Sequence, residues 1–306
     1  MKYIKSKLIL KILILGSLLL ISQQVLAQSW RPVRGSILFG ISGMALISQQ
    51  NSSLDFLVVH DNKQAHQERL GIITIKGKNQ PEYLSVSWQS NTQLPIDLEA
   101  LTSIPNTKDS FIALSSSGKA YKFKLNSDKK TISVSKEFEL PAIPPGSNFE
   151  GFALQNIEGK LVAMWAHRGE GEQASTVYWG VLDLNKYQIT STNSANLKVP
   201  FPSGNVRHIS DIKIDSGGIV YISAASDAGD NGPFKSAIYV AGYLTLSNSS
   251  GQISWRQSPQ LVPLYRFNHH KIEGIELIPG ADGGLIVGTD DENFGAYVYS
   301  LGDNVL

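Results

Sequence analysis

The chain has 306 residues, among them 27 lysines and arginines, 26 aspartates and glutamates, and no cysteine. This nearly neutral balance does not favour nucleic acid or an anionic membrane surface as a partner. The absence of cysteine excludes a disulfide framework and a thiol nucleophile. Stability must therefore come from packing, from hydrogen bonds or from a bound metal ion.

The first 27 residues have the pattern of a secretory signal peptide. Four lysines accompany an apolar run over residues 12–21, and Val25-Leu26-Ala27 resembles a cleavage site. Ten apolar residues are few for crossing a bilayer, so we expect cleavage before Gln28 and no stable membrane insertion. An uncleaved N-terminal anchor is the alternative. Residues 28–306 are expected to form a single secreted or periplasmic domain, which we expect to be monomeric.

Five stretches of the remaining chain share one plan. Each begins with a run of alternating apolar residues and continues with a second apolar run that ends in a polar residue. The first runs are GISGMALI (40–47), DLEALTSI (97–104), NFEGFALQ (148–155), HISDIKID (208–215) and KIEGIELI (271–278). Two further strand-like runs follow in most modules. Four short strands repeated about every 50 to 60 residues are typical of the blades of a β-propeller.

We therefore predict an all-β fold, a β-propeller of five blades with four antiparallel strands each. The last module has only three clear strands, and RPVRGSILF (31–39) can supply the fourth. An N-terminal strand would then close the ring. A sixth blade is the alternative, because the outer strands are poorly defined by sequence.

Polar residues recur at equivalent points of the modules. The first strand of each propeller blade lines the central channel, so residues near its start converge on one mouth. The first runs carry a small or acidic residue there, in chain order Ser42, Glu99, Glu150, Asp211 and Glu273. The second runs close on Asp61, Ser116, His167, Asp227 and Asp290.

The motifs DLEAL, NFEGF and KIEGIEL, with VGTDDEN closing the last module, resemble the phytase-like propellers. They are most similar to bacterial exported proteins grouped under "esterase-like activity of phytase". This resemblance implies calcium ions held by channel carboxylates, basic residues that grip phosphate, and water that attacks a phosphoester. The positions that match as acids are Glu99, Glu150, Asp211, Glu273 and Asp290.

The carboxylates themselves are consistent with a cation site. Like charges in one mouth cannot all stay ionised without a cation, and calcium takes six to eight oxygen ligands. The predicted Ca²⁺ ligands are Asp61, Glu99, Glu150, Asp211, Glu273 and Asp290. The alternative is that each acid binds the backbone of the neighbouring blade as a structural clasp.

Basic residues lie beside the same points of the modules, and a mixed ring of acids and bases suits a small anionic substrate bridged to a metal. The predicted substrate-binding residues are Lys63, Arg168, His208 and Lys271, and the catalytic candidates are His60 and His167. The alternative is that these residues form rim salt bridges, each worth little. Ser42 is not predicted to be a nucleophile, because its surroundings lack the nucleophile-elbow pattern.

Two functions follow from these patterns. The first is a metal-dependent hydrolase of phosphoesters or related esters, with its site at the channel mouth. The second is a non-catalytic binding or scaffold propeller of the cell envelope, in which the channel ring is structural. The fold alone cannot choose between them.

Overall fold

The computed structural model describes residues 30–50, 52–141, 143–247, 250–280 and 283–302. The predicted signal peptide lies outside the described residues. The described residues from Arg31 onward form one compact unit. No helix in the described ranges is long and apolar enough to cross a membrane.

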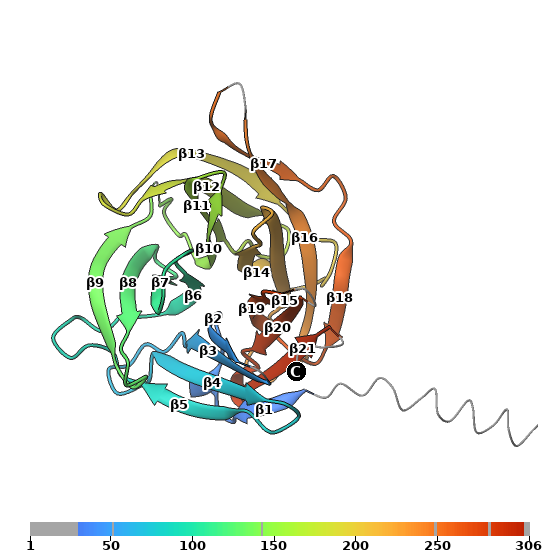
Figure 1. The fold of residues 1–306 in the computed structure, drawn as a ribbon. Coiled ribbons are helices and arrows are strands. Elements are labelled where there is room, and N and C mark those ends of the chain that lie inside the picture. The colour runs from blue at the N-terminus through green and yellow to red at the C-terminus, as the bar shows by residue number, and fades with distance from the viewer. Residues whose placement is uncertain (1–29, 51, 142, 248–249, 281–282, 303–306) are drawn as a thin grey trace, which may run out of the picture. The chain divides into compact units, whose positions relative to one another are not determined.

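Five antiparallel sheets form a ring of blades around a central axis (Figure 1), which confirms the predicted five-bladed β-propeller. Blade 1 consists of β2 (Gly43–Gln50), β3 (Ser53–Val59), β4 (Leu70–Lys76) and β5 (Glu82–Val86). Blade 2 consists of β6 (Leu98–Ser103), β7 (Ser110–Ser115), β8 (Lys119–Leu125) and β9 (Ile132–Glu139). Blade 3 consists of β10 (Phe149–Ile157), β11 (Lys160–His167), β12 (Ser175–Asp183) and β13 (Gln188–Leu197).

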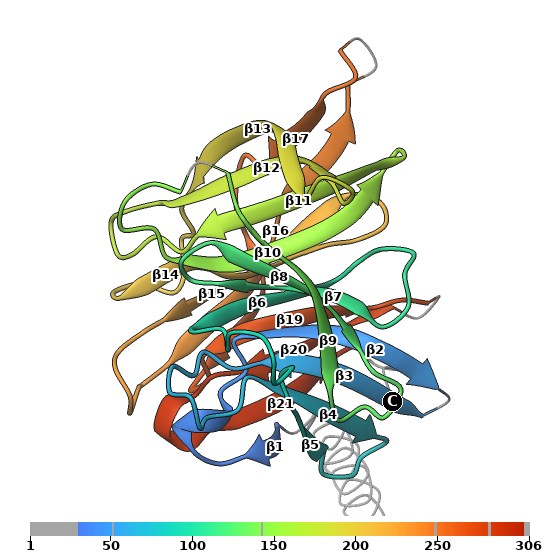
Figure 2. The same cartoon turned by 90° about the vertical axis from the view of Figure 1, so that its left-hand side faces the viewer.

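Blade 4 consists of β14 (Val206–Ile214), β15 (Ile219–Ser226), β16 (Lys235–Leu246), β17 (Ile253–Gln257) and β18 (Pro263–Asn268). Blade 5 consists of β19 (Ile272–Ile278), β20 (Gly284–Thr289), β21 (Ala296–Leu301) and β1 (Arg31–Arg34). Two short 3₁₀ helices, η1 (Ile37–Phe39) and η2 (Glu292–Phe294), complete the described elements. Within blade 2, strand β6 lies nearest the central axis of the propeller and β9 lies on the outside of the ring (Figures 1 and 2).

The long fourth module does not conceal a sixth blade. Its additional strand, β18, pairs with the first half of β16, while β17 pairs with the second half. The two short strands therefore share the outer position of one sheet. This explains why the outer strands could not be counted from the sequence.

The ring closes through β1, which pairs antiparallel with β21 and so completes blade 5. Arg31 lies opposite Val298, and Arg34 lies opposite Ala296. The predicted closure by an N-terminal strand is therefore confirmed. Strands from both ends of the described chain therefore lie in one blade.

Apolar side chains fill the spaces between neighbouring blades rather than one central core. One cluster joins blades 3 and 4, and there the rings of Trp179 and Trp255 meet edge to face with centroids 5.7 Å apart. Similar clusters join blades 1 and 2, blades 2 and 3, and blades 5 and 1. Burying a large apolar side chain contributes roughly 1.5–3 kcal/mol. These seams therefore hold the inner strands in fixed positions around the channel.

Glycine follows the polar position of the first strand in several blades because the inner strands approach closely there. A Cβ atom on Gly43 would lie 2.8 Å from the backbone nitrogen of Leu101 in the next blade. A Cβ atom on Gly151 would lie 2.6 Å from the side chain of Ile212. The Glu-Gly pairs of the sequence thus combine a channel carboxylate with a close contact between blades.

Candidate functional site

Three glutamates occupy the same place in three blades. The register skips Glu99, because Leu98 pairs with Ser115 and Ala100 pairs with Leu114. The same irregularity lies at Glu150 and at Glu273. Such β-bulges re-aim a side chain out of the ladder. The predicted anchors Glu99, Glu150 and Glu273 are therefore equivalent residues of the inner strands.

Blade 4 places an arginine at this position. Val206 pairs with Ser226 as Phe149 pairs with His167 in blade 3, so the next residue, Arg207, is the counterpart of Glu150. The repeat pattern of the sequence predicted Asp211 at this position. The register corrects that assignment, because Asp211 lies four residues further along β14.

Asp211 instead joins two blades, as the clasp alternative anticipated. Its buried carboxylate accepts a hydrogen bond from the backbone N–H of Ile275 in blade 5 at 2.9 Å. Lys213 Nζ lies 3.3 Å from the same carboxylate. Burial raises the pKa of Asp211 to about 6, although Lys213 opposes this shift.

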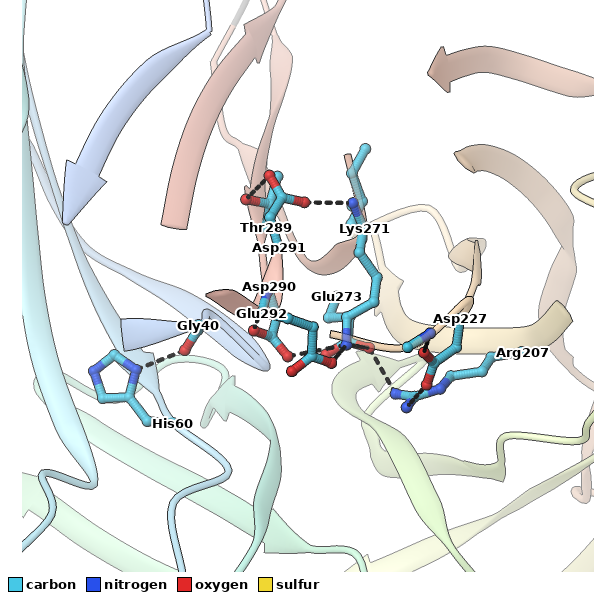
Figure 3. A network of polar contacts seen from close by, with 12 residues as sticks. Gly40, His60, Arg207, Asp227, Lys271, Glu273, Thr289, Asp290, Asp291 and Glu292 are labelled. Atoms are coloured by element: carbon cyan, nitrogen blue, oxygen red, sulfur yellow. Dashed lines mark hydrogen bonds and ion pairs between the residues drawn. The ribbon is translucent and has the colours of Figure 1, made fainter. Parts of the chain in front are cut away.

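Arg207 connects carboxylates of three blades, and Figure 3 shows its contacts with Glu273 and Asp227. Its guanidinium lies 2.7 Å from Glu273 Oε1 and 3.7 Å from Glu150 Oε1, and it also donates to Asp227. Burial alone would lower the pKa of Arg207, but Glu150 and Glu273 hold it well above its ordinary value. The arginine therefore stays charged and compensates part of the negative charge in the mouth.

Lys271 performs the same role beside it (Figure 3). Its ammonium lies 3.4 Å from Glu273 and 3.1 Å from Asp290, and it donates to Glu292. Only 1 % of this side chain is exposed. Burial lowers its pKa, but Glu273 and Asp290 outweigh that effect and raise it well above its ordinary value. Both cations of the inner mouth are thus committed to carboxylates.

A second group of acids lies on the side of blades 1 and 2. One oxygen each from Asp61, Asp97 and Glu99 can be chosen so that all lie within 4.8 Å of one another. Lys63, whose side chain is 60 % exposed, lies 3.0 Å from Asp97. The structure therefore brings the predicted ligands Asp61 and Glu99 together, and adds Asp97.

Glu99, like Asp61, has no hydrogen-bond or ion-pair partner among the described residues. It is 8 % exposed, and no described residue donates a hydrogen bond to it or forms an ion pair with it. Burial, followed by the charges of Glu150 and Glu273, raises its pKa well above the usual range. Burial and Asp290 raise the pKa of Asp61 to about 7. These groups are stable together only when protonated or when a cation joins them.

The predicted histidines lie outside this constellation. His60 is buried, with Nδ1 2.6 Å from the Gly40 carbonyl oxygen and Nε2 2.9 Å from the Tyr83 hydroxyl. Burial lowers the pKa of His60. His208 Nδ1 accepts a hydrogen bond from the backbone of Val199, and its Nε2 lies 2.9 Å from Gly171 O. Both rings therefore tie loops together.

His167 and Arg168, at the end of β11, have different surroundings. His167 Nδ1 accepts a hydrogen bond from the backbone of Gly169. No contact of His167 with a mouth carboxylate occurs among the described residues, so its catalytic role stays a prediction. Arg168, with 23 % of its side chain exposed, lies 3.5 Å from both Glu150 and Glu170. Arg168 is thus the partly exposed cation of the mouth on blade 3.

Asp97 and Arg207 were absent from the predicted site, although the sequence held a signal for one of them. Asn205-Val206-Arg207 matches Asn148-Phe149-Glu150 in its leading asparagine and its apolar second residue. An alignment that started at this asparagine would have placed Arg207 in the ring. Asp97 precedes Glu99 by two residues and gave no repeat signal.

The other end of the channel is a separate polar region. Lys213 Nζ donates to Leu101 O at 2.8 Å, although β14 and β6 belong to blades 4 and 2, which are not neighbours. The lysine therefore crosses the channel. Beyond it lies a cavity of about 710 Å³. Residues of all five inner strands line this cavity, and Glu276 is one of them. Burial raises the pKa of Glu276 to about 7, with Asp211 adding to the shift and Lys213 opposing it.

The raised pKa of Glu276 predicts that the stability of the protein depends on pH. Between about pH 4.5 and pH 7 the folded protein keeps a proton on Glu276 that the unfolded chain releases, so the free energy of unfolding falls as pH rises. Glu276→Gln should flatten this slope, as measured by urea unfolding at about pH 5 and about pH 7. An unchanged slope in the variant would show that Glu276 is ionised in the folded protein throughout this range.

Comparison with known proteins identifies a fold but no family. No family model matches the chain, and no curated protein matches it. Among solved structures, an exo-1,5-α-L-arabinanase from a bovine ruminal metagenomic library is 10 % identical with a TM-score of 0.50. The match covers 88 % of this chain and 94 % of that one.

Two further solved structures are similar. The α-L-arabinofuranosidase of Podospora anserina, solved with cellotriose, is 10 % identical with a TM-score of 0.51, and the match covers 91 % of this chain and 98 % of that one. An exo-β-1,3-galactanase from Clostridium thermocellum is 12 % identical with a TM-score of 0.49, and 86 % of this chain spans 59 % of its length. The likenesses to the arabinanase and the arabinofuranosidase support the propeller fold, and they do not support the more specific phytase-like resemblance.

Proposed function

We propose that this protein is a hydrolase whose active site is the carboxylate-rich channel mouth, with Ca²⁺ held by Asp61, Asp97 and Glu99. The observation that carries the proposal is the buried, unpartnered carboxyl of Glu99 beside the other two acids. Oxygen ligands from carboxylates are what calcium prefers. When bound, the ion would neutralise these charges and polarise a substrate oxygen or a water.

In the rest of the mouth, the inner carboxylates are paired with cations, and two further cations remain partly exposed to a substrate. Arg207 and Lys271 hold the inner carboxylates in place, while Lys63 and Arg168 remain partly exposed at the rim. Glu292 is the candidate proton donor, because burial and then Asp290 raise its pKa. A carboxyl group with a raised pKa is the kind of group that can donate a proton to a leaving group.

The charge balance favours an uncharged, hydroxyl-rich substrate over a phosphoester. The acids of the mouth are Asp61, Asp97, Glu99, Glu150, Asp227, Glu273, Asp290 and Glu292, and its cations are Lys63, Arg168, Arg207 and Lys271. Because Arg207 and Lys271 are already paired, a phosphate would meet mainly negative charge. The similar solved structures bear the names of enzymes that act on glycans, so a glycosidic bond is the proposed target.

Calorimetric melting and hydrolysis assays on the purified protein test this proposal. Ca²⁺ should raise the melting temperature and chelation should reverse the rise, because a ligand that binds only the folded state stabilises it. A 4-nitrophenyl α-L-arabinofuranoside should be cleaved only with Ca²⁺, and 4-nitrophenyl phosphate should not be cleaved.

Each contrary result has a defined meaning. Cleavage of the phosphate in place of the glycoside would overturn the proposed substrate and restore the phosphoester prediction. If neither compound is cleaved and Ca²⁺ leaves the melting temperature unchanged, the hydrolase proposal fails. The non-catalytic propeller then becomes the better interpretation.

A further inference from the structure

The cavity at the other end of the channel has no role in the proposed hydrolase. Its volume of about 710 Å³ lies within the size range of small-molecule sites. The inner strands of the five blades, β2, β6, β10, β14 and β19, each contribute residues to its wall. Because the seams between blades fix these strands, the wall is preformed, and its chemistry indicates what it can bind.

Apolar side chains make up one part of this wall. Leu154 and Ile214 are almost fully buried, whereas Leu46 and Leu277 are half-buried and line the cavity with part of their surface. Covering such surface with the apolar part of a ligand is favourable. The cavity therefore offers binding energy to a small aliphatic group.

One cation serves two carboxylates at this end of the channel. Lys213 Nζ lies 3.3 Å from Asp211 and 4.0 Å from Glu276 Oε2, and it donates to Leu101 O at 2.8 Å. Asp211 also accepts a hydrogen bond from the backbone N–H of Ile275. Asp211 and Lys213 are thus committed to contacts within the protein, whereas the separation of 4.0 Å leaves Glu276 beyond hydrogen-bond distance of the ammonium.

Glu276 is the carboxylate that a ligand can reach. It lines the cavity, and 13 % of its side chain is exposed. The other acid of the lining, Asp215, is fixed in a turn, where its Oδ1 accepts hydrogen bonds from the backbone N–H groups of Gly217 and Ile219. Lys213 is the one cation among the described lining residues. When ionised, Glu276 therefore gives the cavity an excess of negative charge, which attracts a cation and repels an anion.

The strands around Glu276 contribute few other titratable groups. Lys213 and Asp211 of β14 are the charges that act on its pKa. Strands β2 and β20, which also pack against β19, contain no titratable residue, and β15 contributes only Tyr221, whose pKa is raised by burial so that it stays uncharged. Among the described residues, Lys213 is therefore the one positive charge at this end of these strands.

We propose that this cavity binds a primary aliphatic amine. The ammonium group would pair with Glu276, and the alkyl chain would pack against Leu46, Leu154 and Leu277. The ligand then supplies the second cation that the two carboxylates lack, which lowers the cost of keeping both ionised in a largely buried site. The inference goes beyond the proposed hydrolase, whose site lies at the opposite end of the channel, and it requires neither calcium nor turnover.

Titration calorimetry at about pH 8 tests the proposal, because a primary amine is protonated there and Glu276 is largely ionised. n-Butylamine should bind saturably at one site per chain. Butan-1-ol has nearly the same shape without the charge and should bind roughly tenfold more weakly. Ethylamine, which lacks two of the methylene groups, should also bind roughly tenfold more weakly.

Glu276→Gln should abolish the preference for the amine over the alcohol. Glu99→Gln is the matched control, because it removes a buried carboxyl at the mouth and should leave amine binding unchanged. Amine binding that is lost in Glu99→Gln and kept in Glu276→Gln would place the ligand in the mouth and overturn the proposal. A wild-type protein that shows no saturable amine binding, or that binds both compounds equally, would overturn it as well.

The wild-type protein decides if Glu276→Gln does not fold. At about pH 6 Glu276 is mostly protonated, because its pKa is about 7, so pairing with an ammonium must displace a proton. Titrations in buffers of different ionisation enthalpy should then show release of nearly one proton per amine bound, and release should be negligible at about pH 9. Binding without this proton release would contradict the proposal. None of these results bears on hydrolysis at the mouth, which is assayed separately.

Discussion

Glu99→Gln should abolish the calcium-induced rise in melting temperature and lower turnover of the glycoside about 100-fold or more. In chelator, the same variant should melt at a higher temperature than the wild-type protein. The reason is that Glu99 has no described partner, while Glu150, Glu273 and Asp61 surround it with like charge. Removing its charge relieves repulsion in the calcium-free state and removes a ligand in the calcium-bound state.

Differential scanning calorimetry with and without Ca²⁺ measures both effects. Glu82→Gln on β5 is the matched control, because this glutamate is 67 % exposed and Lys76 is its one ion-pair partner among the described residues. The control should behave like the wild-type protein under both conditions. If Glu99→Gln instead melts at a lower temperature in chelator, Glu99 is a structural clasp and not a ligand.

Arg207→Leu should lower the free energy of unfolding by about 3 kcal/mol or more. Its guanidinium contacts Glu150, Glu273 and Asp227, so the substitution leaves carboxylates of three blades without their shared cation. Breaking a buried pair costs more than the pair itself contributes, because the remaining charge stays desolvated. Urea unfolding of both proteins at neutral pH gives the difference directly.

Lys76→Leu provides the contrast for this measurement. Lys76 and Glu82 lie 3.0 Å apart, as close as a strong ion pair, but their side chains are 50 % and 67 % exposed. The loss should stay below about 1 kcal/mol. Equal losses in Arg207→Leu and Lys76→Leu would show that the mouth is well hydrated, contrary to the burial on which the site is argued.

The sequence predicted the blades and the glutamate ring because both repeat. Glu99, Glu150 and Glu273 recur with the apolar alternation around them, and propeller geometry then requires that they converge. Arg207 was not found because a small or acidic residue was expected at each anchor, and Asp211 lay nearby in a longer irregular stretch. The electrostatic reason became visible only in the structure, where a ring of like charges requires a cation within it.

The roles of the histidines were harder to predict, because a histidine beside a polar residue can be catalytic or can be a structural hydrogen-bonding group. His60 and His208 adjoin the polar points of the modules, as catalytic groups would. Three of their four ring nitrogens nevertheless contact loop backbone, and the fourth contacts the Tyr83 hydroxyl. Alternation along a strand sends neighbouring side chains to opposite faces. A shift of one residue, as between His167 and Arg168, therefore decides whether a side chain reaches the mouth.

The pairing of β1 with β21 sets the order in which this molecule can be completed. During synthesis blades 1 to 4 can each form from a contiguous stretch of chain, whereas blade 5 draws on both ends of the domain. Contacts between such distant segments carry the greatest entropy of loop closure and form late. Since Glu273, Lys271 and Asp290 all belong to blade 5 or its entry, the ion pairs of the channel mouth are complete only when blade 5 has joined the other four.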